Sequence, residues 1–278
     1  VRSGMTPIEQ QTILVTGATD GHGKGLAVEL VRRGATVLVH GRDAGRIERT
    51  LEELRGAAPG AKLRGYRADL ASLAEVRALA AEVLAHEPRL DGLVNNAGIG
   101  TRVPEGGRLT SRDGHELRFA VNYLATFLLT RLLLPRIRAS APARIVHVSS
   151  AGQQAIEFDD VMLERGYSGV RAYCQSKLAQ ILFSNDLAEE LAGTGVTSNA
   201  LHPATYMPTK IVASPISALA DGVQATLRLV ADPSLDGVSG RYFDMTRERR
   251  ADAQAYDAEA RRSLRALSEQ LTGLAQGT

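Results

Sequence analysis

Short apolar runs alternate with longer amphipathic stretches along most of the chain. The short runs are rich in Val, Ile and Leu and predict buried strands, whereas apolar residues that recur every three or four positions predict helices. The expected strands are 12–16, 36–40, 63–68, 90–95, 144–149, 196–201 and 240–243, and the expected helices are 23–33, 43–55, 72–86, 112–137, 172–191 and 216–231. Strands separated by a helix need crossover connections and run parallel. The pattern therefore predicts an α/β Rossmann fold, a doubly wound parallel sheet of about seven strands with helices on both faces.

The alternation continues without a break that could separate two domains. We find no linker, internal repeat or low-complexity segment, and we predict a single domain over residues 5–278. Residues Val1–Gly4 precede Met5 and are expected to be an expression remnant. Residues 246–278 are predicted to form a C-terminal helical extension, whose charged part at 246–262 is interpreted as a solvated helix or loop.

Composition narrows the class of protein. Hydrophobic residues make up 44% of the 278 residues, which is enough for a large core. The net charge of +2 comes from Lys and Arg scattered among acidic residues, a pattern that does not favour nucleic acid. The single Cys174 excludes an intramolecular disulfide, the six histidines lack metal-ligand spacing, and no apolar stretch approaches the roughly 20 residues that span a bilayer. We therefore expect a cytoplasmic protein without a metal, a nucleic-acid partner or a membrane span.

A glycine-rich turn follows the first expected strand, where the sequence reads Thr16-Gly17-Ala18-Thr19-Asp20-Gly21-His22-Gly23. Glycines let the backbone turn tightly and approach a pyrophosphate, and the free amides and dipole of the following helix attract its negative charge. An ordinary strand-to-helix turn would look similar, but a dinucleotide-binding fold places this turn after its first strand, as here. We therefore expect contacts with a nucleotide cofactor from Gly17, Thr19, Asp20, Gly21, His22, Gly23 and Lys24.

The end of the second expected strand bears on the choice between NADP and NAD. The sequence there is Val39-His40-Gly41-Arg42-Asp43, so a glycine stands about where an acidic residue would hold the 2′-hydroxyl of NAD. Arg42 instead suits the 2′-phosphate of NADP, since a guanidinium forms forked bonds with phosphate oxygens. Asp43 either caps the next helix or pairs with Arg42. The pattern favours NADP(H) over NAD(H).

Two later strand ends add polar residues to the same edge of the sheet. Asp69-Leu70 ends the third strand, and Asn95-Asn96-Ala97-Gly98 ends the fourth. Asp69 can accept a bond from an adenine amino group and Asn95 can line the cleft, but a helix cap or a turn residue is an equal alternative for each. Because both strand ends are in register with the glycine turn, we predict cofactor contacts from Asp69, Leu70, Asn95, Ala97 and Gly98.

Together with Asn122, Ser150 and Tyr173-x-x-x-Lys177, these motifs resemble those of the short-chain dehydrogenases/reductases over about residues 12–243. Within that family, residues 173–179 and the long segment before them are most similar to the retinol-dehydrogenase-like and light-dependent protochlorophyllide-reductase-like branch, which is typically NADPH-linked.

The resemblance also implies a role for each matching residue. Tyr173 would exchange a proton with the substrate oxygen, and Lys177 would bind the nicotinamide ribose and lower the pKa of the tyrosine. Ser150 would hydrogen-bond the substrate oxygen, and Asn122 would hold a water of the proton relay. The segment after the sixth strand would pass the nicotinamide, with contacts from Pro203, Ala204 and Thr205, although Ala204 replaces the glycine that is common there.

The chemistry of these residues agrees with the resemblance. A free tyrosine has a pKa of about 10, and an ammonium one helical turn away, as Lys177 is from Tyr173, stabilises its phenolate. A tyrosine packed under an aliphatic lysine stem is the alternative at this spacing. Asn122 lies in an otherwise apolar helix, where its amide is disfavoured. Ser149 and Ser150 must face opposite sides of their strand, and the resemblance selects Ser150.

The segment 151–172 begins and ends beside catalytic positions, so we expect it to shape the substrate pocket. Its apolar content suggests a lipophilic substrate. The predicted function is an NADPH-dependent oxidoreductase that interconverts a carbonyl and an alcohol. The alternatives are reduction of a conjugated C=C bond and a non-catalytic NADP(H)-binding regulator on the same fold. Relatives often pair through the helices that carry Asn122 and Tyr173, and either a homodimer or a monomer fits.

Overall fold

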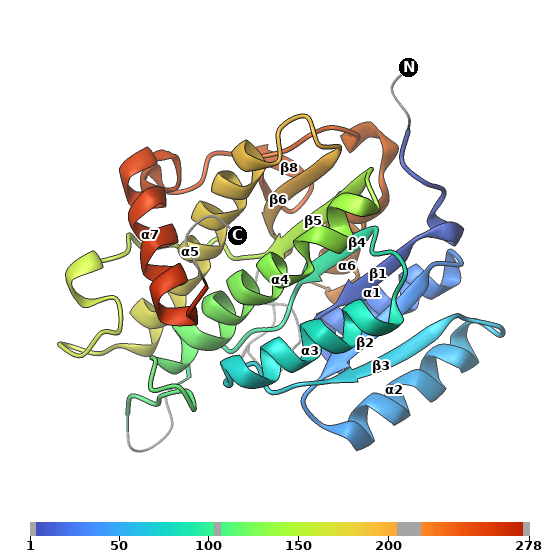
Figure 1. Ribbon diagram of the computed structural model, residues 1–278, viewed down its shortest axis with the longest axis horizontal. Coiled ribbons are helices and arrows are strands. Elements are labelled where there is room, and N and C mark those ends of the chain that lie inside the picture. The colour runs from blue at the N-terminus through green and yellow to red at the C-terminus, as the bar shows by residue number, and fades with distance from the viewer. Residues whose placement is uncertain (1–3, 103–106, 205–217, 275–278) are drawn as a thin grey trace.

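The computed structural model describes residues 4–102, 107–204 and 218–274. In this part of the chain, one sheet has the strand order β3-β2-β1-β4-β5-β6-β7-β8, and all its neighbours are parallel except β7 and β8 (Figure 1). The strands are β1 Thr12–Val15, β2 Thr36–Gly41, β3 Leu63–Arg67, β4 Gly92–Asn95, β5 Ala143–Val148, β6 Val196–His202, β7 Tyr242–Asp244 and β8 Arg247–Arg249. The predicted doubly wound fold is confirmed, with one antiparallel edge strand that the pattern did not predict.

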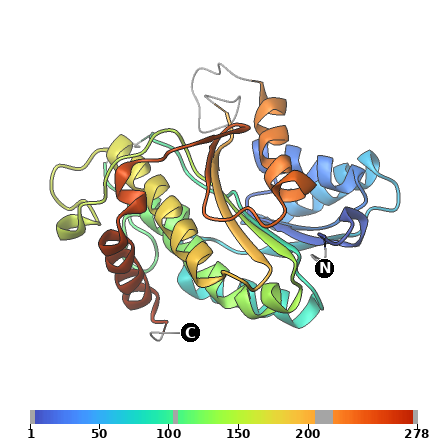
Figure 2. The ribbon, with the colours of Figure 1, turned by 90° about the horizontal axis from the view of Figure 1, so that it is seen from above.

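Helices cover both faces of the sheet (Figures 1 and 2). One face carries α1, α2 and α6, and the other carries α3, α4 and α5. The helices are α1 Gly21–Arg32, α2 Ala44–Ala57, α3 Leu73–His86, α4 Ala125–Ala139, α5 Gly169–Glu190, α6 Leu219–Ala231 and α7 Ala258–Thr272. Shorter helical turns are η1 Ile8–Gln10, η2 Phe119–Leu124, η3 Phe158–Asp160, η4 Pro233–Leu235 and η5 Ala253–Tyr256.

Alternating side chains of the buried strands supply two separate cores. In β1, Ile13 and Val15 belong to the core under α1 and α6, whereas Leu14 belongs to the core on the opposite face. This follows from the two-residue period of a strand, which turns successive side chains to opposite faces. Every residue of β1 is buried, as expected for a central parallel strand.

Side-chain caps begin several of the helices. Asp43 accepts a hydrogen bond from the Arg46 amide at 2.7 Å and caps α2, which decides between the two interpretations that the sequence left open for it. Ser72 and Ser168 cap α3 and α5 in the same way. The serine cap at 168 sets the start of the helix that carries Tyr173 and Lys177.

The helix predicted at 112–137 starts later than expected. Residues 111–116 form turns and one isolated bridge between Thr110 and Glu116, and the helical segment begins at Leu117 and leads into η2, a π-helical stretch. It continues directly into α4 and ends at Ala139. A π-helical stretch within a longer helix is uncommon and is frequently found at functional sites.

The C-terminal part adds a layer outside α5. Helix α7 packs on α5, so that its inner residues Ala260, Leu264 and Ser268 are buried (Figure 2). Residues 247–249 are exposed as expected, although they form a strand rather than a helix or loop, and the start of α7 is a surface helix in which Ala260 alone of residues 258–262 is buried. Within the described ranges, no helix has both the length and the apolar character needed to cross a membrane.

Candidate active site

The glycine turn lies where the strand order reverses between β1 and β4, the usual ligand position in such sheets. Gly17 has a φ of +65°, and a β-carbon on it would lie 2.9 Å from the Ala97 Cα. A β-carbon on Gly23 would lie 2.3 Å from the Gly17 carbonyl oxygen. Side chains at these two positions would push the turn away from the end of β4, so the close approach requires glycine.

His40 fastens this turn to the neighbouring strand ends. Its Nδ1 accepts a hydrogen bond from the Gly17 amide at 3.1 Å, which leaves Nε2 to donate to the Ala68 carbonyl, also at 3.1 Å. Burial lowers the pKa of His40 to about 4, so the ring is neutral near pH 7 and keeps both bonds. This role of His40 could not be predicted, because a lone histidine at a strand end has many uses.

Asn96 and His22 link the glycine turn to the end of β4 and to α6 by further hydrogen bonds. The Asn96 amide nitrogen donates to the Thr16 carbonyl at 2.8 Å, so its oxygen faces His22 and accepts from Nδ1 at 2.8 Å. The other ring nitrogen lies 3.0 Å from both the Gly222 carbonyl and the Thr226 hydroxyl of α6. Both ring nitrogens of His22 are thus engaged by protein groups, and the predicted contact of this residue with the cofactor stays a prediction.

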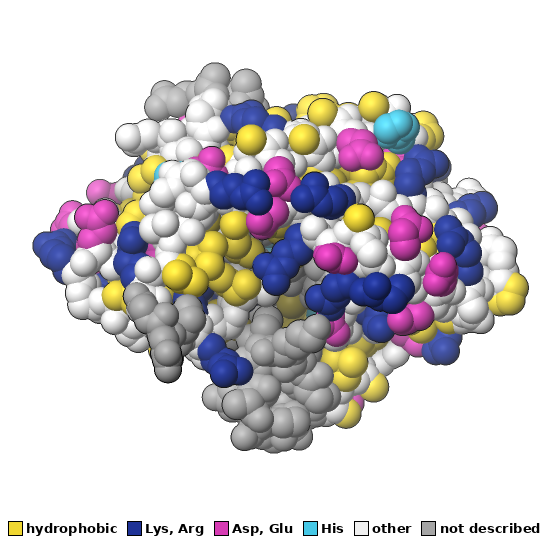
Figure 3. Space-filling model, turned by 90° about the horizontal axis from the view of Figure 1, so that it is seen from below, with side chains coloured by type: hydrophobic (Ala, Val, Ile, Leu, Met, Phe, Trp, Pro, Cys, Tyr) yellow, Lys and Arg dark blue, Asp and Glu magenta, His cyan; other side chains and the backbone are white. Residues whose placement is uncertain are grey.

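Cationic side chains lie around the expected adenosine end. Arg42 is exposed just beyond β2. Arg46 of α2, which the sequence reasoning did not select, pairs with Asp20 at 2.8 Å, and its amino nitrogen lies 3.4 Å from the Thr19 carbonyl. Lys24, by contrast, pairs with Glu53 of α2 at 2.7 Å. Figure 3 shows Lys and Arg side chains around a hollow on one face of the molecule, with hydrophobic side chains beside it.

Some residues at the ends of β3 and β4 lie near the glycine turn, and others are buried in the core. Asp69 accepts from the Ala71 amide at 3.0 Å and forms the turn before α3. Asn95 turns into the core, where its amide donates to the Thr130 hydroxyl at 3.0 Å. This side chain is therefore neither a helix cap nor a turn residue, and the predicted cofactor contact of Asn95 stays a prediction. Leu70 is buried, whereas Ala97 and Gly98 continue into the loop that faces the glycine turn.

Lys177 projects from α5 into a fully buried position beneath the end of β5. Its ammonium donates to the Val148 carbonyl at 2.8 Å and to the Gln180 side-chain oxygen at 3.1 Å. Burial lowers its pKa to about 7. Tyr173, one helical turn earlier, has its ring centroid 5.8 Å from the same ammonium. The predicted pair is therefore adjacent, as its spacing on the helix required.

Ser150 reaches the same place from the end of β5. A β-carbon built on Gly152 would lie 3.4 Å from the Ser150 hydroxyl oxygen and 3.8 Å from the Tyr173 ring, so these two side chains share one small space. The Ser150 oxygen accepts from the Gly152 amide at 3.0 Å. Ser149 points the other way and donates to the Lys177 carbonyl at 2.7 Å. The alternation along the strand thus separates the two serines as expected.

Asn122 approaches from the π-helical stretch. Its side-chain oxygen accepts from the Ile99 amide at 2.8 Å, and its nitrogen donates to the Ile99 carbonyl at 3.1 Å and to the Ser176 hydroxyl at 2.9 Å. A β-carbon on Gly98 would lie within 3.4 Å of both the Asn122 oxygen and the Lys177 ammonium nitrogen. Asn122 therefore joins the loop after β4 to the catalytic helix.

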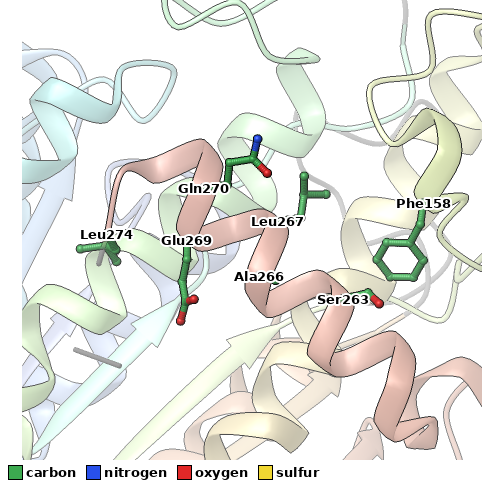
Figure 4. A pocket seen from close by; sticks show the side chains of 7 residues that line it. All are labelled: Phe158, Ser263, Ala266, Leu267, Glu269, Gln270 and Leu274. Atoms are coloured by element: carbon green, nitrogen blue, oxygen red, sulfur yellow. The ribbon is translucent and has the colours of Figure 1, made fainter. Parts of the chain in front are cut away.

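Pro203 and Ala204 are buried at the end of β6, while Thr205 lies outside the described residues. A surface groove of about 540 Å³ lies elsewhere, between η3 and α7, with Phe158 and Ser263 at one end and Leu274 at the other (Figure 4). None of its lining residues is a predicted site residue. Among the described residues, no cluster of three or more His, Cys, Asp or Glu side chains could hold a metal ion.

The fold and this cluster of side chains define a nucleotide-dependent oxidoreductase of one family. The chain belongs to the short chain dehydrogenases, whose family pattern matches residues 11–218. It is thus an NAD(P)-dependent short-chain dehydrogenase/reductase, a class that interconverts alcohols and carbonyls.

Within the family, the chain is similar to retinol dehydrogenases. It is 41% identical to retinol dehydrogenase 13 of Mus musculus, over 96% of this chain and 85% of that protein. This likeness confirms the retinol-dehydrogenase-like branch that the motifs suggested.

Solved structures of relatives include complexes with both nicotinamide cofactors. A short chain dehydrogenase from Shigella flexneri complexed with NADP is 27% identical, with a TM-score of 0.70 over 86% of this chain and 98% of that one. A 3-ketoacyl-(acyl-carrier-protein) reductase from Brucella melitensis complexed with NADH is 25% identical, with a TM-score of 0.68 over 85% of this chain and 97% of that one.

Proposed function

We propose that this protein uses NADP(H) to interconvert a lipophilic alcohol and its carbonyl, with Tyr173 as the acid/base. The observation that carries this proposal is the convergence of Tyr173, Ser150 and Lys177 beside the glycine turn, described above. The bound nicotinamide would supply or accept the hydride. Gly17 and Gly23 let the turn approach the end of β4 closely, and the backbone amides at the start of α1 would face the pyrophosphate.

Each catalytic side chain then has a distinct task. The Ser150 hydroxyl orients the substrate oxygen, and Tyr173 gives its phenolic proton to that oxygen during reduction and takes it back during oxidation. When protonated, the Lys177 ammonium stabilises the phenolate that remains, and the Val148 carbonyl and Gln180 oxygen occupy two of its three N–H donors. Asn122 braces Ile99 and Ser176 and so holds the loop after β4 against α5.

Substitution of the tyrosine tests catalysis. In Tyr173→Phe, the rate of carbonyl reduction should fall by about 100-fold or more, because general acid catalysis typically contributes that much. The dissociation constant for NADPH, measured by fluorescence, should stay within about twofold. The control is Tyr256→Phe at the end of η5, which should keep the wild-type rate. A Tyr173→Phe enzyme with an unchanged rate would support the non-catalytic regulator instead.

The preference for NADP is proposed from the adenosine end. Gly41 carries no carboxylate, and a β-carbon there would lie 2.6 Å from the Thr19 methyl group. Arg42 is exposed beside it, and Arg46 lies within reach of Thr19 and Asp20 from α2. Two guanidinium groups at this position suit a 2′-phosphate.

Arg42→Ala should raise the dissociation constant for NADPH by about 10- to 100-fold, the usual value of a charge-assisted hydrogen bond. The constant for NADH should stay within about twofold. Arg55→Ala, at the last turn of α2, makes the same change of net charge and should affect neither. Equal weakening of both cofactors by Arg42→Ala would refute the assignment of the 2′-phosphate to this residue.

The lipophilic substrate is proposed from the names of the relatives, since retinol is an apolar alcohol. The apolar residues of 151–172 give less support for a lipophilic substrate than the sequence suggested, because Ile156 and Val161 pack into the core between the sheet and helices α3, α4 and α5. Turnover of small polar carbonyls alone would contradict a lipophilic substrate. Product analysis distinguishes an alcohol from a saturated carbonyl and so separates this reaction from reduction of a conjugated C=C bond.

A further inference from the structure

A buried charged network lies one helical turn before Asn122. Glu116 is completely buried and Arg118 is 3% exposed, and their side chains approach to 3.6 Å. The Tyr167 hydroxyl lies between them: it accepts from Arg118 Nη1 at 2.7 Å and donates to Glu116 Oε1 at 2.9 Å. Burial and the Glu116 charge raise the pKa of Tyr167 to about 12, so the hydroxyl keeps its proton at neutral pH.

The network joins two segments that are distant in the sequence. Arg118 donates from Nε to the Gly100 carbonyl at 2.7 Å and from Nη2 to the Arg102 carbonyl, which secures the loop after β4. Tyr167 belongs to the segment between β5 and α5. The Glu116 amide also donates to the Met162 sulfur at 3.3 Å, so a second contact reaches the same segment.

Both segments lead directly into the active site. On one side, Ile99 precedes Gly100 and is held in both directions by the Asn122 amide. On the other side, the segment starts at Ser150 and continues through the helix cap at Ser168 to Tyr173. Displacement of Tyr167 from Arg118 would therefore shift two segments that lead to the reacting groups without removing any of those groups.

The network is not needed for burial alone. Ile156 and Val161 already pack this segment into the core, and a buried ion pair is costly because both charges leave water. Apolar side chains of similar volume often stabilise a protein as well as such a pair does. The polar network instead defines how the two segments lie relative to each other, because each of its hydrogen bonds fixes one atom of one segment against the other.

We infer that Glu116, Arg118 and Tyr167 are positioning residues that hold segment 161–168 against the loop 99–102 and so place the wall on which the remote part of a large substrate packs. This inference rests on the proposed oxidoreductase function. A small substrate occupies only the space near Tyr173 and Ser150, whereas a long one uses binding energy from this wall. Loosening the network should therefore penalise long substrates selectively.

The test compares two tyrosine variants that each remove one hydroxyl. Tyr167→Phe opens the network, and Tyr66→Phe is the matched control, because the Tyr66 hydroxyl donates to the buried Glu87 at 2.5 Å and Arg64 donates to the same oxygen at 2.6 Å. Tyr66 lies in β3 at the edge of the sheet, far along the strand order from β5. Reduction of straight-chain aldehydes from propanal to decanal is followed with NADPH.

In Tyr167→Phe, the ratio of kcat/KM for decanal to that for propanal should fall about tenfold, mainly through KM for decanal. The NADPH dissociation constant and the propanal rate should stay within about twofold. Tyr66→Phe should leave the ratio unchanged. An equal loss for both aldehydes, or the same change of ratio in Tyr66→Phe, would show a general loss of stability and overturn the inference.

Hydrogen–deuterium exchange provides a readout that needs no turnover. Exchange in 161–168 and 99–102 should become faster in Tyr167→Phe and not in Tyr66→Phe. Unchanged exchange in these segments would overturn the positioning role even in an active enzyme. A wild-type protein that reduces none of the aldehydes with either cofactor would instead remove the proposed function and, with it, the role in substrate size.

Discussion

Lys177 is an unusual residue of the site because its ammonium is buried and, among the residues that the structure describes, has no carboxylate as a hydrogen-bond partner. The Val148 carbonyl and the Gln180 side chain are both neutral acceptors, so burial dominates and lowers the lysine pKa to about 7. The unfolded chain would bind this proton with an ordinary pKa near 10.5. The folded state therefore binds fewer protons than the unfolded state between these two values.

This difference predicts how stability depends on pH. Stability should rise with pH from about 7 to 10, with a contribution from Lys177 of at most about 1.4 kcal/mol per pH unit, because one proton is released on folding there. Lys177→Met should remove that contribution and flatten the curve. Urea unfolding between pH 6 and 10 measures it, with Lys62→Met, an exposed lysine before β3, as the control. A wild-type slope retained in Lys177→Met would contradict the lowered pKa.

His40 gives a second prediction at the scale of one residue. His40→Phe leaves the Gly17 amide and the Ala68 carbonyl without their partner, and buried groups in that state cost roughly 1–3 kcal/mol each. The free energy of unfolding should fall accordingly, and NADPH should bind more weakly because the turn is no longer fastened. His86→Phe, at the exposed end of α3, should change the free energy of unfolding by less than about 0.5 kcal/mol. Equal losses of unfolding free energy in the two variants would contradict this role of His40.

At the scale of elements, regular hydrophobic periods allowed the seven parallel strands and most helices to be predicted. The short apolar run of β1 and the apolar repeats in α1 are local properties, so the sequence alone reveals them. Strand β8 could not be predicted, because Arg247–Arg249 has no apolar alternation and pairs only where β7 offers a free edge. The π-helical stretch also escaped prediction, because the apolar spacing of 112–137 does not distinguish a π-helical turn from an α-helical one.

The candidate site shows the same division. Tyr173, Lys177 and Ser150 could be selected because helix and strand periods place them, and the family motifs agree. His40, Arg46 and the network around Arg118 could not, because each acts through contacts with residues distant in the sequence. The direction of the Asn95 side chain could not be predicted either: this residue ends β4, and its amide bonds to Thr130 in the core.

A hydrogen bond connects α7 to η2, and its contribution to stability can be tested. The Tyr123 and Ser268 hydroxyl oxygens lie 2.6 Å apart in a fully buried position. Ser268→Ala leaves the Tyr123 hydroxyl unpaired and should cost roughly 1–3 kcal/mol of unfolding free energy. Adding Tyr123→Phe should recover most of that loss, since neither polar partner then remains. A double variant as unstable as the sum of the two single variants would show that the hydroxyls do not interact.

At the scale of the whole molecule, α7 converts a three-layer fold into one with an added outer layer beside α5. A chain that ends at Asp257 should lose about 1.5–3 kcal/mol for each fully buried large side chain that α7 contributes, such as Leu264. The uncovered apolar face should also promote self-association. Light scattering and urea unfolding measure the two effects, with the exposed substitution Arg262→Ala as the control. A monomeric truncated protein of wild-type stability would contradict this role of α7.

The two edge strands of the sheet limit how copies of this chain can associate. At one margin, β3 exposes Arg64 and Arg67, and at the other, β8 exposes Arg247 and Arg249. Two copies that tried to continue the sheet across either margin would bring these guanidinium groups together, and charged outer strands of this kind oppose such growth. Any assembly of this protein is therefore expected to use its helices, and its strands should resist joining into longer ribbons.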